Sequence, residues 1–337
     1  MIPFRPVDDY PSTFSAAILR SRLCSTAIFI CLMLCILPAT ARTYSVVVTG
    51  LGGNTEYSEA FSASSEVFNS ALSSLESDAS LIVSLDETST RETILEAIAQ
   101  QAARMQSDLA AGADDAMQEP TFVLIMTGHG NADTNGWRFN VTGPDISSDD
   151  LIAALNTVPT ATQLVVLAAS ASGAALDTMS QLGRVLVTAT KSGGEINAIR
   201  FHNFLSEAMK SDVADYDRNE ILTIAEAYRF AEARTVEYYE QQNLLASEHS
   251  RIRGENADDV AVALLGSLRD AKDDPLVATL LEERLGLEQT FKALRQRKPD
   301  MPVETYYREL EVLLLSIARL QQSIDEATGW SDGDANS

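Results

Sequence analysis

Cysteine is scarce in this sequence. Of the 337 residues only Cys24, Cys31 and Cys35 are cysteines, and all three lie within the first 41 residues. If this region is removed on secretion, the mature chain has no thiol. A disulfide, a thiolate nucleophile and a metal site built on cysteine are then all excluded.

The apolar run that surrounds these cysteines, Leu23 to Leu37, is shorter than the roughly 20 residues of a membrane-spanning helix. Arg20 and Arg22 precede it and the small residues Ala39-Thr-Ala41 follow it, as in a cleavable signal peptide. We therefore expect residues 1–41 to be removed and the mature protein to be secreted or periplasmic. A membrane-attached protein with an uncleaved leader is the alternative, because the segment before Arg20 is long and carries Asp8 and Asp9.

Basic residues are also few. The chain has 25 lysines and arginines against 48 acidic residues, a formal net charge of -23. Removal of residues 1–41, which carry a net charge of +1, leaves about -24. Such a field repels phosphate backbones and anionic lipids, so we expect neither nucleic-acid binding nor peripheral membrane binding. A basic partner is compatible with this charge.

Histidines and glycines are too few or too scattered for two common cofactor sites. The three histidines, His129, His202 and His249, lack the spacing of zinc ligands. We expect His202 on a helix surface and His249 paired with Glu248. The segment Gly50-Leu-Gly-Gly53 lacks the third glycine of a dinucleotide fingerprint, which favours a tight structural turn. No cofactor is expected, apart from a calcium ion for which residues 215–226 are the candidate loop.

The chain contains a regular alternation of apolar strands and amphipathic helices. Helices are expected after Thr90 and from a capping-box-like start at Ser147–Asp150. The strands are expected at residues 42–49, 80–85, 121–126, 164–167 and 184–188. Continuous β-branched runs of this kind suit strands that are covered on both faces. The order predicts an α/β fold with a mostly parallel sheet and helices on both faces.

Two reactive side chains follow neighbouring strands of this predicted sheet. His129, between two glycines, comes directly after the strand 121–126, and Ser170 follows the strand 164–167. The carboxyl ends of parallel strands meet at one edge, where ligands bind in such folds. We therefore expect His129 and Ser170 to lie close together there.

This pairing resembles the legumain (asparaginyl endopeptidase) family of caspase-fold cysteine peptidases. The likeness covers residues 42–253 and rests on the His129-Gly130 and Ser172-Gly173 segments. It implies a caspase-like fold, with His129 as the base, the amide of Gly130 in the oxyanion site and Ser170 at the position of the nucleophilic cysteine. Ala168 stands where the family has an acidic residue that recognises asparagine, which also departs from legumain specificity.

Three functions are compatible with this pattern. The first is a secreted pseudoenzyme without cysteine-peptidase activity that binds a peptide or protein ligand. The second is a serine-dependent hydrolase with a His129/Ser170 dyad, although a serine needs a base oriented by a carboxylate, and only Asp133 and Asp145 are nearby in sequence. There is also no Gly-x-Ser-x-Gly elbow. The third is a structural envelope or assembly protein.

A twelve-residue segment that begins at Asp215 has the ligand spacing of an EF-hand calcium loop. Glu220 occupies the position where the sharp turn of such a loop favours glycine, so a surface loop that leads into a helix over residues 225–233 is favoured and a calcium site is the alternative. The candidate calcium ligands are Asp215, Asp217, Asn219, the carbonyl of Ile221, Thr223 and Glu226.

The last part of the chain has the 4-3 spacing of a helical hairpin or short coiled coil. Apolar residues recur from Tyr306 to Ile324 and, upstream, from Leu280 to Leu294, and Lys298–Pro302 separates the two runs. We expect four regions: the signal peptide at 1–41, an α/β domain at 42–255, a helical region with an antiparallel hairpin at 256–328 and a disordered tail at 329–337. Packing within the hairpin is expected, and homodimerisation through it is the alternative.

Overall fold

The structure is a computed structural model that describes residues 42–76, 78–111 and 120–329. The expected signal peptide at 1–41, and residues 330–337 of the expected tail, lie outside the described residues. Within the described ranges, no helix combines the length and the apolarity required to cross a membrane.

A six-stranded sheet forms the centre of the described chain, in the order β10-β8-β7-β3-β1-β2. Neighbouring strands are parallel except for β10, which is antiparallel to β8. The strands are β1 (Thr43–Thr49), β2 (Ile82–Leu85), β3 (Thr121–Gly128), β7 (Thr162–Ala169), β8 (Arg184–Thr188) and β10 (Arg251–Arg253).

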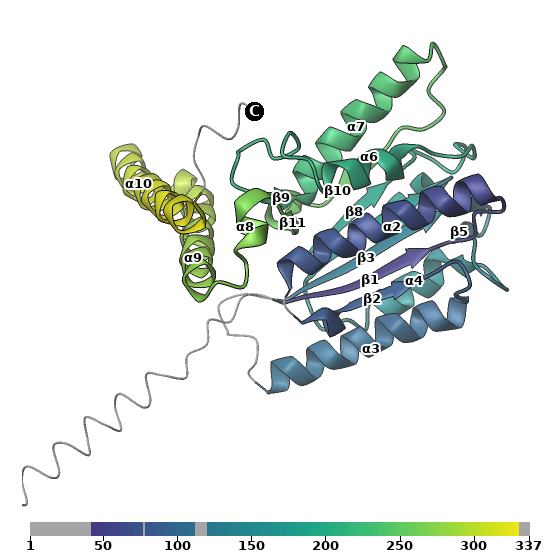
Figure 1. Cartoon of the computed structure of the whole chain (residues 1–337), viewed down its shortest axis with the longest axis horizontal. Coiled ribbons are helices and arrows are strands. Elements are labelled where there is room, and N and C mark those ends of the chain that lie inside the picture. Colours follow the sequence, from purple (N-terminus) through teal and green to yellow (C-terminus); the bar gives the residue numbers. More distant parts are fainter. Residues whose placement is uncertain (1–41, 77, 112–119, 330–337) are drawn as a thin grey trace, which may run out of the picture. The chain divides into compact units, whose positions relative to one another are not determined.

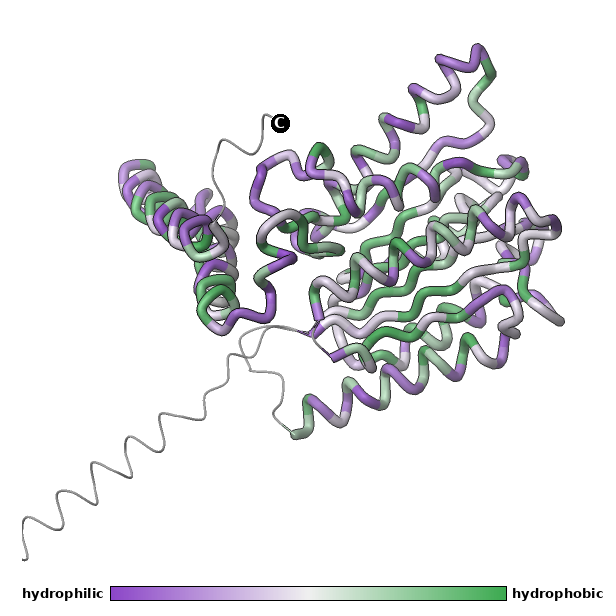
Figure 2. Tube along the Cα trace, in the orientation of Figure 1, coloured by the Kyte–Doolittle hydropathy of each residue, from purple (hydrophilic) through white to green (hydrophobic). Residues whose placement is uncertain are grey.

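Helices cover both faces of this sheet (Figure 1). On β1, Val47 packs into one hydrophobic cluster with helices of the first face, whereas Val46 and Val48 pack into a second cluster on the other face. The first face is covered by α2 (Thr55–Leu75), α6 (Phe201–Ala208) and α7 (Ile224–Gln241), and the second by α3 (Arg91–Ala110), α4 (Ser148–Leu155) and α5 (Leu176–Met179). Figure 2 shows the resulting apolar strands between helices of mixed hydropathy. The α/β fold class predicted from the sequence is confirmed.

Polar side chains set the start of several helices. The Ser147 hydroxyl accepts a hydrogen bond from the Asp150 amide at 3.1 Å, and the Asp150 carboxylate accepts one from the Ser147 amide at 3.0 Å. This reciprocal capping box confirms the predicted start of α4, and Thr90 begins α3 in the same way. The strand expected at 80–85 starts later, because Asp78 accepts the Ser80 amide and holds Ala79–Leu81 in a 3-10 turn, η2.

Two small antiparallel sheets flank the main one. The first follows β3 directly and comprises β4 (Gly130–Asp133), β5 (Gly136–Phe139) and β6 (Ile146–Ser147). The second pairs β9 (Ile221–Thr223) with β11 (Ala261–Leu264). Val262 and Ala263 of β11 belong to the hydrophobic cluster that contains α2 and α7. Short helical turns lie at η3 (Ser172–Ala175), η4 (Ala257–Asp259), α8 (Gly266–Asp270) and η5 (Lys298–Asp300).

The predicted hairpin is present as α9 (Pro275–Arg297) and α10 (Val303–Thr328). Its predicted seam forms two clusters. Leu294, Tyr306 and Leu313 are buried together near the turn between the helices, and Val277 and Ile324 are buried with Leu268 of α8 at the other end. The hairpin therefore packs on itself along both helices.

Candidate functional site

His129 and Ser170 leave neighbouring parallel strands at the same register. Gly128 at the end of β3 is the Cα partner of Ala169 at the end of β7, so the next residue on each strand is one of the two candidates. An added Cβ at Gly130 would lie 2.7 Å from the Ser170 carbonyl oxygen, which shows how closely the two loops approach. The Trp137 indole donates to the same carbonyl at 3.1 Å. Both candidate residues therefore lie at the carboxyl edge of the sheet.

The Ser170 hydroxyl is enclosed. The residue is 2 % exposed, and its Oγ has no hydrogen-bond partner in the described part of the chain. Buried hydroxyls are normally hydrogen-bonded, so this one is an exception. The loop around it is fixed: Ala171 adopts the left-handed region with φ 57° and donates its amide to the Glu195 carbonyl at 2.8 Å. In this arrangement the hydroxyl is shielded from solvent.

His129 is half-buried against aromatic rings at the start of α2. Its imidazole lies 4.9 Å from the Tyr57 ring and 5.1 Å from the Phe61 ring, edge to face in both cases. Burial lowers the pKa of His129, and a hydrogen bond to the Gly52 backbone opposes the shift. Because this bond raises the pKa, the imidazole N–H donates to the carbonyl of Gly52. The neutral ring is thus held by the turn that follows β1.

The two carboxylates considered as orienting partners for His129 have other roles. Asp133 forms a salt bridge with Arg138 at 2.8 Å across the β4–β5 hairpin, and its pKa is lowered by that contact. Asp145 accepts the Val141 amide at 3.4 Å. A carboxylate-oriented base of the kind that activates serine is therefore not assembled from these residues.

The expectation for His202 was wrong. The residue is 1 % exposed, and its Nδ1 lies 2.9 Å from the Ser64 hydroxyl of α2. Burial, together with the nearby Arg200 and His129, lowers the pKa of His202 to about 3, so the ring is neutral. Phe61 contacts both His129 and His202, at 5.1 and 5.0 Å. Phe61 and Ser64 are spaced to lie on one face of α2, which predicts a buried face of that helix but does not reveal that His202 packs against it.

The expectation for His249 was also wrong. Its partner is Glu195, whose carboxylate lies 2.5 Å from the His249 Nδ1 and also accepts the His249 amide at 3.1 Å. Glu248 instead turns inward and accepts the amides of Arg200 and Phe201 at 2.7 and 3.1 Å at the start of α6. The backbone carbonyl of Glu195 also accepts the Ala171 amide, so the His249–Glu195 pair lies next to the Ser170 loop. Sequence spacing carries no signal for a pair 54 residues apart.

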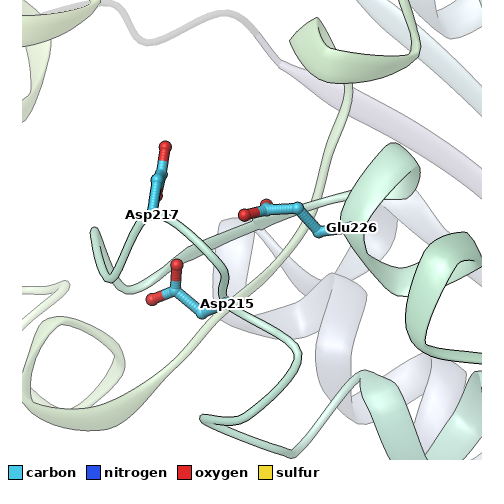
Figure 3. Close-up of side chains that lie close together, drawn as sticks. All are labelled: Asp215, Asp217 and Glu226. Carbon is cyan, nitrogen blue, oxygen red and sulfur yellow. The ribbon is translucent and has the colours of Figure 1, made fainter.

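The candidate calcium loop brings three carboxylates together (Figure 3). Oxygens of Asp215, Asp217 and Glu226 all lie within 4.8 Å of one another. Loss of hydration in this crowded loop, followed by repulsion from Glu226 and Asp215, raises the pKa of Asp217 to about 6. Closely spaced carboxylate oxygens of this kind are what a hard divalent cation such as Ca²⁺ requires.

The other expected calcium ligands lie in the same loop with defined hydrogen bonds. The side-chain Nδ2 of Asn219 donates to the Asp217 carboxylate at 2.8 Å, and the side-chain Oδ1 of Asn219 accepts the Ile221 backbone amide at 2.7 Å. The Thr223 hydroxyl caps α7 and bonds to Glu226 at 2.8 Å. A bound cation would have to share Glu226 with this cap.

No family model matches the chain, and the curated proteins include none that is significantly similar in sequence. Among solved structures, caspase-1 from Spodoptera frugiperda is similar with 12 % identity and a TM-score of 0.43, over 68 % of this chain and 90 % of that one. The structure of drICE is similar with 11 % identity and a TM-score of 0.40, over 65 % of this chain and 90 % of that one.

Proposed function

We propose that this chain is a secreted, legumain-like protein of the caspase fold that binds a peptide or protein segment at the carboxyl edge of its sheet and lacks cysteine-peptidase activity. The observation that carries the proposal is the state of the two ancestral positions. His129 and Ser170 keep the register of a catalytic pair, while residue 170 is a serine whose hydroxyl is buried and unpartnered.

Chemistry supports binding over catalysis at this edge. A thiol is partly ionised near neutral pH, but a serine hydroxyl needs an oriented general base to become nucleophilic. The His129 imidazole has its pKa lowered by burial and is bonded to a backbone carbonyl rather than to a carboxylate. The carboxyl edge of the sheet is nevertheless the place where ligands bind in open α/β folds.

Two labelling experiments test the proposal on the full chain. The first uses a fluorophosphonate probe, which we expect to leave Ser170 unmodified in the folded protein. Labelling at Ser170 that is lost in Ser170→Ala would overturn the pseudoenzyme proposal and establish the serine-hydrolase alternative.

The second experiment uses a pool of randomised octapeptides that carry a photoreactive benzophenone. Cross-links mapped by mass spectrometry are expected on the loops that follow β1, β3, β7 and β8. The exposed face of α10 provides an internal comparison, because it carries the apolar side chains of Leu314 and Leu315 far in sequence from these loops. Cross-links confined to α10 would contradict binding at the sheet edge.

A further inference from the structure

A pocket opens at the carboxyl edge of the sheet, on the β1 and β2 side. It has a volume of about 620 Å³ and is formed by the turn after β1, the first turns of α2 and the loop after β2. Its walls include Leu51, Ser58, Glu59, Glu87, Thr88 and Thr142. This pocket is separate from the buried Ser170 hydroxyl and from the calcium loop.

The pocket and His129 share one short turn. The Leu51 amide donates to the Asn140 carbonyl at 3.2 Å, and the Asn140 amide donates to the His129 carbonyl at 3.0 Å. The imidazole of His129 is itself bonded to the backbone of Gly52, the next residue of the same turn. A Cβ on Gly52 would lie 2.3 Å from the Ser58 amide nitrogen, so the turn is packed directly on the pocket wall. A ligand in the pocket therefore lies one turn away from His129.

The charged side chains that line the pocket are all acidic. Glu59 and Glu87 line it, and none of the described residues that line it is basic. The Glu87 carboxylate accepts the Ser58 hydroxyl at 2.7 Å, and neither glutamate forms a salt bridge in the described part of the chain. A cleft lined by charges of one sign concentrates the field and raises the local concentration of opposite charge.

The start of α2 also lines the pocket and would by itself favour an anion. Its positive end is equivalent to about half an elementary charge. Asn54 already accepts the Tyr57 amide there, and Glu56 adds an acidic side chain in the first turn. Two full carboxylates in the walls outweigh this half charge, so a cation is favoured.

We propose that this pocket binds the basic side chain, arginine or lysine, of a peptide segment that lies along the carboxyl edge of the sheet. The proposal rests on the peptide-binding function proposed above and names its specificity. The carboxylates of Glu59 and Glu87 supply charge-assisted hydrogen bonds to the cationic group, and the hydroxyls of Thr88 and Thr142 supply further acceptors. Leu51, which is 36 % exposed, offers apolar surface to the side-chain stem.

Matched peptide pools test this specificity. Two fluorescein-labelled octapeptide pools have randomised flanks and a fixed central residue, which is arginine in one and its neutral isostere citrulline in the other. Fluorescence anisotropy with the full chain should give about tenfold tighter binding for the arginine pool at low salt. This preference should fall as ionic strength rises.

Two double variants separate the pocket from the general acidity of the protein. Glu59→Gln with Glu87→Gln should reduce the preference for arginine to less than about twofold, and Gln at 87 keeps an acceptor for Ser58. Glu304→Gln with Glu311→Gln removes the same charge from the exposed face of α10 and should keep the preference. Circular dichroism checks that both variants fold.

The possible outcomes distinguish this inference from the function on which it rests. Equal binding of the two pools, or an equal loss of the arginine preference in both double variants, would overturn the basic-side-chain specificity. If benzophenone cross-links were still found at the sheet edge, the proposed peptide binding would stand. Absence of both pool binding and edge cross-links would overturn the two proposals together. Loss of the arginine preference in the Glu59/Glu87 variant alone supports the inference.

Discussion

At the scale of single residues, the position of a side chain does not by itself determine its reactivity. His129 and Ser170 follow paired strand ends, which is the placement that a catalytic pair requires. Their surroundings differ from those of a catalytic pair, because the hydroxyl is enclosed and the imidazole is held by a backbone carbonyl between aromatic rings. Reactivity depends on these contacts, and residue type alone does not reveal them.

Replacement of Ser170 by cysteine tests this enclosure. In Ser170→Cys the new thiol should react with iodoacetamide at least about a hundredfold more slowly in the folded protein than in urea, because alkylation requires an exposed thiolate. Peptide mass spectrometry separates this site from Cys24, Cys31 and Cys35. Ser192→Cys, at an exposed position on the following loop, should react rapidly in both conditions. Rapid labelling at 170 in the folded state would contradict the enclosed hydroxyl.

Glu76, at the end of α2, provides a test of pH dependence. Burial raises the pKa of its carboxyl to about 7, although the Thr43 amide, at 2.5 Å, opposes the shift. The folded state therefore binds this proton more tightly than the unfolded state. The contribution of the carboxyl to stability is greatest below the unfolded pKa of about 4.5 and is lost as the pH rises through about 7.

We expect Glu76→Gln to gain stability relative to the natural protein as the pH rises from 5 to 8, by about 2 kcal/mol. Urea unfolding at several pH values measures the difference. A difference that is constant over this range would show that the carboxyl has the same pKa in the folded and unfolded states.

At the scale of elements, the starts of helices follow from local chemistry and the burial of side chains does not. The capping boxes at Thr90 and Ser147 involve residues three positions apart, so the sequence predicts them directly. The sequence around His202 predicts a surface position, because it does not reveal that α2 packs on this helix. The pairs His249–Glu195 and Glu248–Phe201 also depend on contacts between distant segments.

The loop before α7 combines strain with a cap on another helix. Glu220 has φ 60°, in the left-handed region, and its carboxylate accepts the amides of Ser267 and Leu268 at 3.1 and 2.8 Å at the start of α8. Both Glu220→Ala and Glu220→Gly lose these bonds, but only glycine relieves the strain. Glu220→Ala should therefore be less stable than Glu220→Gly by about 1 kcal/mol in thermal or urea unfolding. Equal stability of the two variants would indicate that the backbone strain is negligible.

The three carboxylates of the same loop repel one another without a cation. Addition of Ca²⁺ at pH 7.5 should therefore raise the melting temperature relative to EDTA, and the effect should weaken at pH 5, below the Asp217 pKa of about 6. Asp217→Asn should abolish the response to Ca²⁺ and should be more stable than the natural protein in EDTA. If Asp217→Asn were less stable than the natural protein in EDTA, the Asp217 carboxylate would stabilise the loop, and repulsion among the three carboxylates would not be the dominant effect.

At the scale of the whole molecule, hydrophobic packing is divided between the α/β sheet and the hairpin. Two clusters cover the faces of the main sheet, and a separate one, with Leu294, Tyr306 and Leu313, lies between α9 and α10. The sequence predicted both parts because each has its own periodicity, of strands and helices in the first and of a 4-3 seam in the second. It did not predict that β11, beyond residue 255, packs into the core of the sheet, since four residues of strand carry little signal.

This division predicts that the end of the hairpin opens independently of the sheet. Leu313 is 8 % exposed within the cluster at that end, whereas Leu315, on the same helix, is 51 % exposed. Leu313→Ala should lower the local stability of α9 and α10 by about 2–4 kcal/mol, because it leaves a cavity in a small cluster. Amide hydrogen exchange should then become faster in the two helices while β1, β3 and β7 keep their protection. Leu315→Ala should change neither the local stability of the hairpin nor its amide exchange rates. Faster exchange in the central strands of Leu313→Ala would instead mean that the hairpin and the sheet unfold as one cooperative unit.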